Sequence, residues 1–248
     1  MMTTRPKPIT ELYAFLVEHH HVNAVIQHGF IGESLSPATV DDRALLLMHR
    51  VLQTQSRPKL DPICQFFSRV RDERAHRTFA AFRKLVTADG KLRVVDGLAL
   101  QPGWGAKTAA LFVRNLAYIE STPKLRAKFW RDTRVLEGDQ LRLPVDAVIL
   151  TIFETLAPRI NWPKAISAPN VGRYFHNDLG YRDEELLVWD DLWFWGFVTQ
   201  KTVQGRTREL GWNESKYWAI PHAPRDRQSI ADIRRCSERF LKLICAAK

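Results

Sequence analysis

The stretch LQPGWGAKTAA, residues 100–110, decides the fold around it. Pro102 lacks a backbone N–H and its ring clashes with the preceding turn, so a short helix over residues 94–100 has to end there. Gly103 and Gly105 permit a tight turn with positive φ. After the turn, apolar residues recur at spacings of three, four and seven, which predicts a second helix over residues 106–119. The sequence therefore predicts a helix-hairpin-helix at residues 94–119.

The start of the second predicted helix is suited to binding an anion. The first backbone amides of a helix have no acceptor within the helix, and they lie at the positive end of its dipole. The amides that follow Gly105 are therefore free to bind a phosphate oxygen. Lys107 lies in the same turn.

A second segment, LPVDAV at residues 143–148, completes a recognisable pattern. Together with the hairpin it resembles the helix-hairpin-helix Gly/Pro-Asp superfamily of DNA glycosylases, whose members share a pattern close to Pro-Gly-x-Gly-x-Lys-Thr-Ala, then Val-Asp. The matched segment covers about a fifth of the chain. By this resemblance Lys107 is the catalytic lysine and Asp146 the catalytic aspartate.

Two features separate the chain from the best-known members of that superfamily. The interval from Lys107 to Asp146 is longer, and it is more similar to that of the archaeal type of 8-oxoguanine glycosylase. The chain has three cysteines, so it lacks the four-cysteine iron–sulfur cluster of endonuclease III. The resemblance is therefore closer to 8-oxoguanine-type members without a cluster.

The resemblance implies a base-excision enzyme that forms a Schiff base through Lys107 and has AP lyase activity. Its substrate would be an oxidised purine such as 8-oxoguanine, or a hypermodified cytosine of phage DNA removed in host defence. The DNA backbone would contact Pro102, Gly103, Trp104, Gly105 and Thr108. The residues leave other hypotheses open: a non-catalytic hairpin protein in a repair or recombination assembly, or an enzyme acting on RNA. Lys107 would then bind phosphate, and Asp146 would only cap a helix.

Four further residues are candidates for a pocket that holds a flipped base. Gln27 and His28 end a predicted helix over residues 11–27, and their side chains can donate to or accept from base edges. Trp189 and Trp193 are four residues apart in an aromatic-rich predicted helix, so they share a face and offer apolar walls. The alternatives are a plain helix end for the first pair and a core stripe for the second.

Composition agrees with a globular protein that binds a polyanion. The 248 residues are 45% hydrophobic and carry a net charge of +10, which favours DNA, RNA or an anionic membrane as the partner. The resemblance to the glycosylases implies that the partner is double-stranded DNA. Three scattered cysteines form no disulfide framework or zinc spacing, so a reducing compartment is expected. We find no signal peptide and no apolar run of membrane-spanning length. A cytoplasmic, nucleoid-associated monomer is expected, or a nuclear one if the source is a eukaryote, without metal or other cofactor.

The periodicity predicts a mainly α fold with one small β-hairpin at residues 135–143, centred on Gly138 and Asp139. The whole chain, residues 1–248, is expected to form one two-lobed domain in which the N- and C-terminal segments pack as one lobe. The basic, aromatic segment at residues 124–131 would either line the DNA groove or lie in the core. The remaining helices are predicted over residues 37–55, 63–85, 147–156, 183–201 and 229–246.

Overall fold

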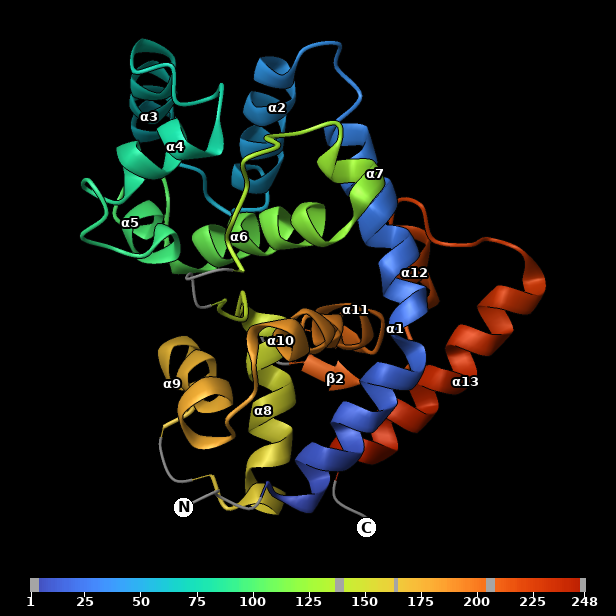
Figure 1. Cartoon of the computed structure of the whole chain (residues 1–248). Helices are drawn as coiled ribbons and strands as arrows, with labels where there is room; N and C mark the ends of the chain where they lie inside the picture. Colours follow the sequence, from blue (N-terminus) through green and yellow to red (C-terminus); the bar gives the residue numbers. More distant parts are fainter. Residues whose placement is uncertain (1–4, 137–140, 163–164, 204–207, 246–248) are drawn as a thin grey trace. The chain divides into compact units, whose positions relative to one another are not determined.

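The computed structural model describes residues 5–136, 141–162, 165–203 and 208–245. Over these ranges the chain is mainly α-helical with one small antiparallel sheet, which confirms the predicted fold class (Figure 1). It divides into two compact units. One comprises Met1–Gly29 and Val145–Lys248, and the other comprises Phe30–Pro144.

The unit of residues 30–144 is built around the longest of its helices, α6 (Ala106–Ser121). One face of α6 is buried, and its Phe112 ring lies 5.4 Å from Phe82 and 5.6 Å from Trp104. Phe129 and Trp130 are buried in the same core, so the segment at residues 124–131 contributes core side chains. The other helices of this unit are α2 (Val40–Leu52), α3 (Leu60–Asp72), α4 (Phe79–Val86), α5 (Val94–Ala99) and α7 (Pro123–Arg126).

The single helix predicted over residues 63–85 is wrong, because the chain breaks between α3 and α4. Arg74 adopts a left-handed conformation with φ of 54°, which an α-helix does not tolerate. A new helix then starts at Phe79, where the Asp132 carboxylate accepts the N–H groups of Phe79 and Ala80 at 3.0 and 2.9 Å. A carboxylate 52 residues away in sequence thus provides the hydrogen-bond acceptor that the first N–H groups of α4 lack within the helix.

The other unit contains the beginning of the chain and its second half. Its first helix, α1 (Lys7–Ser34), packs against the last, α13 (Arg227–Ile244): the Phe15 and Phe240 rings lie 5.8 Å apart, and Arg239 donates to Glu18 at 2.8 Å (Figure 1). The remaining elements are α8 (Ala147–Ile160), α9 (Ala168–Arg173), the π-helical turn η1 (Tyr174–Asp178), α10 (Asp183–Trp189), α11 (Asp191–Val198), β1 (Gln200–Thr202), β2 (Arg208–Leu210) and α12 (Glu214–Trp218).

Helix α1 is longer at both ends than the sequence predicts. Thr10 does not cap it, since its hydroxyl donates to the Pro6 carbonyl at 3.4 Å inside the first turn. At the other end, the helix continues through Gly29 and Gly32. A Cβ atom on Gly29 would lie 2.4 Å from the His222 ring, so this glycine serves close packing rather than helix termination.

The sheet forms at a different place from the predicted hairpin. The turn residues Gly138 and Asp139 lie outside the described residues, and the described parts of residues 135–143 form no strand. Instead, β1 pairs with β2, with Gln200 opposite Leu210. The helix predicted over residues 183–201 accordingly ends at Val198, and it is divided into α10 and α11 at Asp190.

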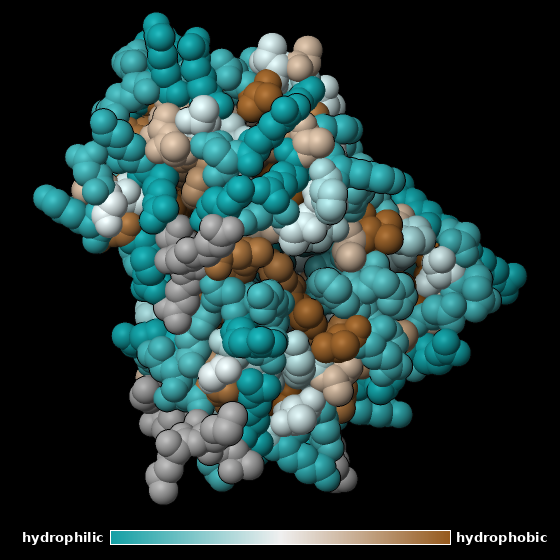
Figure 2. Space-filling model, viewed as in Figure 1, coloured by the Kyte–Doolittle hydropathy of each residue, from teal (hydrophilic) through white to brown (hydrophobic). Residues whose placement is uncertain are grey.

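The surface in view is largely polar. Teal, hydrophilic residues cover much of the face in Figure 2, in keeping with a charged content of 26%. The basic residues of α3, α4 and their connection lie at exposed positions, as a solvated or phosphate-facing surface requires. They are Arg69, Arg71, Arg74, Arg77, Arg83 and Lys84.

Candidate functional site

The helix-hairpin-helix takes the predicted form, and its second helix extends to residue 121. Helix α5 ends at Ala99, and Gly103 turns the chain with φ of 81°. A Cβ atom on Gly103 would lie 2.5 Å from the Ile63 side chain and 2.9 Å from its backbone. The Gly103 carbonyl accepts the Gln55 side-chain amide at 2.8 Å. Both φ and packing therefore require glycine at this turn.

The second glycine of the turn has a different role from the first. Gly105 has φ of −154°, so the expectation of positive φ there is wrong. It lies in open space, with nothing within 4 Å of where a Cβ would stand. Gly105 has no side chain to cap α6, and among the described residues no acceptor is recorded for the amides of Ala106 and Lys107, so both can bind a ligand oxygen. The open surface allows such an oxygen to approach closely.

Two residues predicted to contact the DNA backbone have buried side chains. Trp104 is 9% exposed, and its ring lies edge-on to Phe66 at 5.4 Å, inside the core. The Thr108 hydroxyl is buried and satisfies the turn itself, accepting from the Gly105 N–H and donating to the Gly105 carbonyl, both at 3.1 Å. Pro102 is half-buried beside Gly103. The open part of the turn is therefore Gly105 and the amides that follow it.

Lys107 is the second residue of α6, in the unit of residues 30–144. Its side chain is half-exposed, and its ammonium donates to the Thr54 carbonyl at 3.5 Å. Thr54 follows helix α2, so this contact holds the Lys107 ammonium next to the C-terminal end of α2. The positive end of α6 also acts on the ammonium, since Lys107 lies in the first turn.

Asp146 begins helix α8 in the other unit. Its Oδ1 accepts the N–H groups of Val148 at 2.8 Å and Ile149 at 3.2 Å, so the carboxylate is an N-cap. Its Oδ2 accepts the indole N–H of Trp193 at 3.1 Å. One carboxylate oxygen of Asp146 therefore caps α8, which is the structural role that the sequence left open. The other oxygen binds Trp193, a residue predicted to lie in the base pocket.

Trp193 lies in a small cluster with two residues that the sequence did not single out as site residues. Its ring stacks on Phe197 with centroids 4.9 Å apart and planes 12° apart. The Lys216 ammonium lies 4.8 Å from the centroid of Phe197. Burial lowers the pKa of Lys216, the nearby Arg208 cation lowers it further, and the Asp146 carboxylate opposes both effects. Periodicity places Phe197 on the face of Trp193, but no sequence signal points to Lys216.

The other candidates for the base pocket have different surroundings. Trp189 is 0% exposed and packs against Tyr13, Phe175 and Tyr181, with ring centroids 5.4, 4.6 and 5.2 Å away. It is a core residue, so the prediction that it walls a base pocket is wrong. Gln27 is half-buried and His28 is exposed, both within α1 rather than at its end. Among the described residues, no hydrogen bond, ion pair or ring contact joins either side chain to Asp146 or Trp193.

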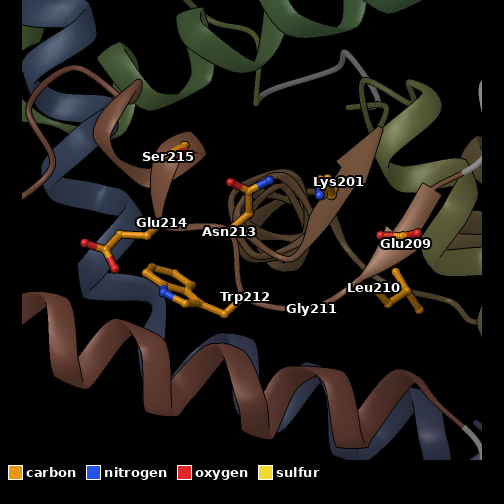
Figure 3. Close-up of a pocket in the computed structure, with 8 residues that line it drawn as sticks. All are labelled: Lys201, Glu209, Leu210, Gly211, Trp212, Asn213, Glu214 and Ser215. Carbon is orange, nitrogen blue, oxygen red and sulfur yellow. The ribbon is translucent and has the colours of Figure 1, made fainter. Parts of the chain in front are cut away.

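A separate cavity of about 400 Å³ lies where the sheet meets the start of α12 (Figure 3). None of the predicted site residues lines it. Its wall combines acidic, basic and amide side chains with the indole of Trp212. The lining residues are Lys201, Glu209, Leu210, Gly211, Trp212, Asn213, Glu214 and Ser215.

The three consecutive histidines of α1 diverge. His20 Nδ1 lies 2.8 Å from Oδ2 of the buried Asp191, whereas His19 packs edge-on against Phe15 at 4.6 Å. Among the residues described, no group of three or more histidine, cysteine or acidic side chains is arranged to hold a metal ion. Within the same residues, none of the helices combines the length and apolar character needed to span a membrane.

Comparison of the chain with protein-family models, with curated proteins and with solved structures finds no match.

Proposed function

We propose that this chain is a DNA glycosylase with AP lyase activity, which flips a damaged or modified base out of double-stranded DNA and excises it. The observation that carries the proposal is the turn before α6. Gly105 leaves the first amides of α6 open, and Lys107 stands in that same turn. One element thus offers a phosphate-binding surface and a primary amine together.

The hairpin would hold the DNA backbone without reading its sequence. Amide-to-phosphate contacts position a protein on DNA, and they carry no base specificity. An enzyme that acts on the glycosidic bond also has to take the nucleotide out of the stack. The net charge of +10 favours association with the polyanion.

Lys107 would be the nucleophile. Its neutral amine attacks the sugar C1′, the bond from C1′ to the base breaks, and the base leaves with the bonding electron pair and takes up a proton. The nitrogen loses a proton, the C1′–O4′ bond breaks with its electron pair, and O4′ takes up that proton, so the sugar ring opens and a protonated Schiff base remains at C1′. Removal of a C2′ proton then expels the 3′ phosphate, which nicks the strand.

Asp146 would act through its charge, as the resemblance to the glycosylases implies. A carboxylate stabilises the positive charge that develops on the sugar as the base leaves. Trp193 donates to that carboxylate and offers its ring to the flipped base, which gives the two residues a joint role. The substrate would be an oxidised purine such as 8-oxoguanine or a hypermodified cytosine of phage DNA, processed by a monomer in the cytoplasm.

Borohydride trapping on a panel of duplexes tests this function. The panel contains 8-oxoguanine, uracil, oxidised pyrimidines, an abasic site and phage DNA with modified cytosines. We expect a covalent adduct with one base and with the abasic site, and we expect Lys107→Gln to abolish it while DNA binding persists. Lys84→Gln, an exposed lysine of α4 in the same unit, is the control and should trap normally. Undiminished trapping by Lys107→Gln would remove this lysine from the mechanism.

A second function is favoured by one observation: both key residues have structural partners. The Lys107 ammonium binds the Thr54 carbonyl, and Asp146 caps α8. A non-catalytic hairpin protein that binds DNA in a repair or recombination assembly needs no more than this. It would bind duplexes with a strong salt dependence and yield neither adduct nor free base from any of them.

A further inference from the structure

Helix α11 exposes two aromatic rings on an otherwise buried element. Six of its eight residues are buried, and the two that are partly exposed are Trp193 and Phe197. Their parallel rings form what we call the Trp193–Phe197 platform. Burying both rings as well would be the ordinary outcome for so apolar a helix. A partly exposed, stacked pair is instead suited to a planar ligand.

Each ring of this platform has a charged neighbour, and the two charges have opposite signs. At one end, the Trp193 indole donates to Asp146 at 3.1 Å. At the other end, the Lys216 ammonium lies 4.8 Å from the Phe197 centroid. Lys216 and Asp146 influence each other electrostatically, yet no ion pair joins them within the described residues. The carboxylate therefore contacts one ring and the ammonium lies over the other, without forming an ion pair with each other.

The Lys216 ammonium lacks a polar partner among the residues that the structure describes. Among the described residues, no side-chain or backbone oxygen accepts a hydrogen bond from it, although the side chain is half-buried. The pKa of Lys216 is lowered, mainly by this burial. The neighbouring cation, Arg208, is engaged, because it donates to the Gln200 side chain at 2.9 Å. Lys216 is thus a donor-only group next to an aromatic surface, and an acceptor brought by a ligand would satisfy it where the described residues do not.

We propose that the Trp193–Phe197 platform binds a nucleobase that carries an exocyclic carbonyl oxygen, and that Lys216 donates a hydrogen bond to this oxygen. The inference rests on the proposed function, since it names the class of base that is excised. A ring is favoured over a phosphate because stacking uses the aromatic faces, from which a phosphate gains nothing. A carbonyl is favoured over an amino group because an ammonium has three donors and no acceptor.

Matched nucleosides test the role of the carbonyl directly. Inosine and purine riboside differ at the 6-oxo group and the neighbouring N1 proton, and uridine and 2-pyrimidinone riboside differ at the 4-oxo group and the neighbouring N3 proton. Binding is followed by NMR through the indole N–H signal of Trp193, assigned with Trp193→Phe. We expect the oxo member of at least one pair to bind about tenfold more tightly, as for a hydrogen bond to a charged group.

Three variants assign that preference to Lys216. Lys216→Met keeps the apolar stem and should bind both members of the pair equally, whereas Lys216→Arg should keep part of the preference. Lys201→Met removes an exposed lysine of β1 and should behave as the wild type. A wild type that binds both members equally or binds neither, or a preference that survives Lys216→Met, overturns the inference.

Failure of the inference is distinguishable from failure of the proposed function. The nucleoside preference does not depend on Lys107 chemistry. If no duplex gives an adduct but the preference and its loss in Lys216→Met are observed, the excision proposal falls and the base site stands. If trapping succeeds and Lys216→Met changes neither nucleoside preference nor excision, the excision proposal stands and the role of Lys216 falls.

Discussion

Asp146 and Trp193 form a hydrogen bond of 3.1 Å between Oδ2 and the indole N–H, while Oδ1 of the same carboxylate caps helix α8. One side chain therefore begins a helix and orients an exposed aromatic ring on another. This division between the two oxygens lets the stability of the fold and the proposed chemistry be separated by substitution.

Asp146→Asn and Asp146→Ala should differ in stability. Asparagine is also a good N-cap, so its oxygen can still serve the Val148 and Ile149 amides, and the fold should be retained. Alanine removes the cap, which should cost about 0.5–2 kcal/mol in the free energy of unfolding. Urea unfolding measures both. Under the proposed function, base release is slow in both variants, because the negative charge is lost. A fully active Asp146→Asn would exclude a charge-based role.

Gly103→Ala and Gly105→Ala form a matched pair in the hairpin. At Gly103 the substitution combines φ of 81° with a clash against Ile63, so we expect a loss of about 1–3 kcal/mol. At Gly105 the backbone is extended and the space is open, so stability should change by less than about 0.5 kcal/mol. Thermal unfolding compares the stability of the two variants. Binding to duplex DNA is then measured for the stable Gly105→Ala, which should bind more weakly than the wild type if the amides hold phosphate.

Trp189→Ala and Trp193→Ala should differ in how much they lower the free energy of unfolding, because Trp189 is a core residue and Trp193 is partly exposed. Trp189 is fully buried among three aromatic rings, and its truncation should cost about 3–5 kcal/mol. Trp193 is partly exposed, so its truncation should cost clearly less while abolishing nucleoside binding. Equal destabilisation of the two variants would show that Trp193 is also a core residue.

The pair His20–Asp191 should make stability fall as pH rises. Burial raises the pKa of Asp191 from 3.8 to about 6, so folding opposes its ionisation and stability is lost between these values. The bond to Asp191 raises the pKa of His20 above 6.5, so that contribution is present below pH 6.5 and is lost as pH rises through the folded pKa. Both effects have the same sign.

Urea unfolding between about pH 4 and pH 8 tests this pair, with Asp191→Asn as the comparison. The asparagine variant removes the buried carboxyl and the raised pKa of His20 together. The stability of the wild type relative to Asp191→Asn should therefore decrease with rising pH across this interval. A difference that stays constant or increases would contradict the assignment.

The hairpin shows how far local sequence reaches in this protein. Pro102, Gly103 and the apolar spacing of residues 106–119 act over one or two turns, and the helices observed at Val94–Ala99 and Ala106–Ser121 lie within two residues of those predicted. Asp146 was likewise recognisable as a helix N-cap, because capping involves residues two and three positions onward. Local steric and hydrogen-bonding rules suffice for such features.

Contacts between residues distant in sequence decided the rest. The carboxylate of Asp132 binds the first amides of α4, where the sequence predicts that one longer helix continues. The ring of His222 leaves room only for glycine at position 29 of α1, where the sequence predicts a helix end. The pairing of Gln200 with Leu210 ends the aromatic helix early.

The sequence by itself determined the mainly α fold, the hairpin and the residue types available for chemistry. Tertiary structure alone decided that Trp189 is buried and Trp193 partly exposed, and that Lys216 stands beside Phe197. The physical reason is that periodicity shows which residues share a helix face. Whether a side chain on that face is covered, and by what, depends on groups that only the fold brings near.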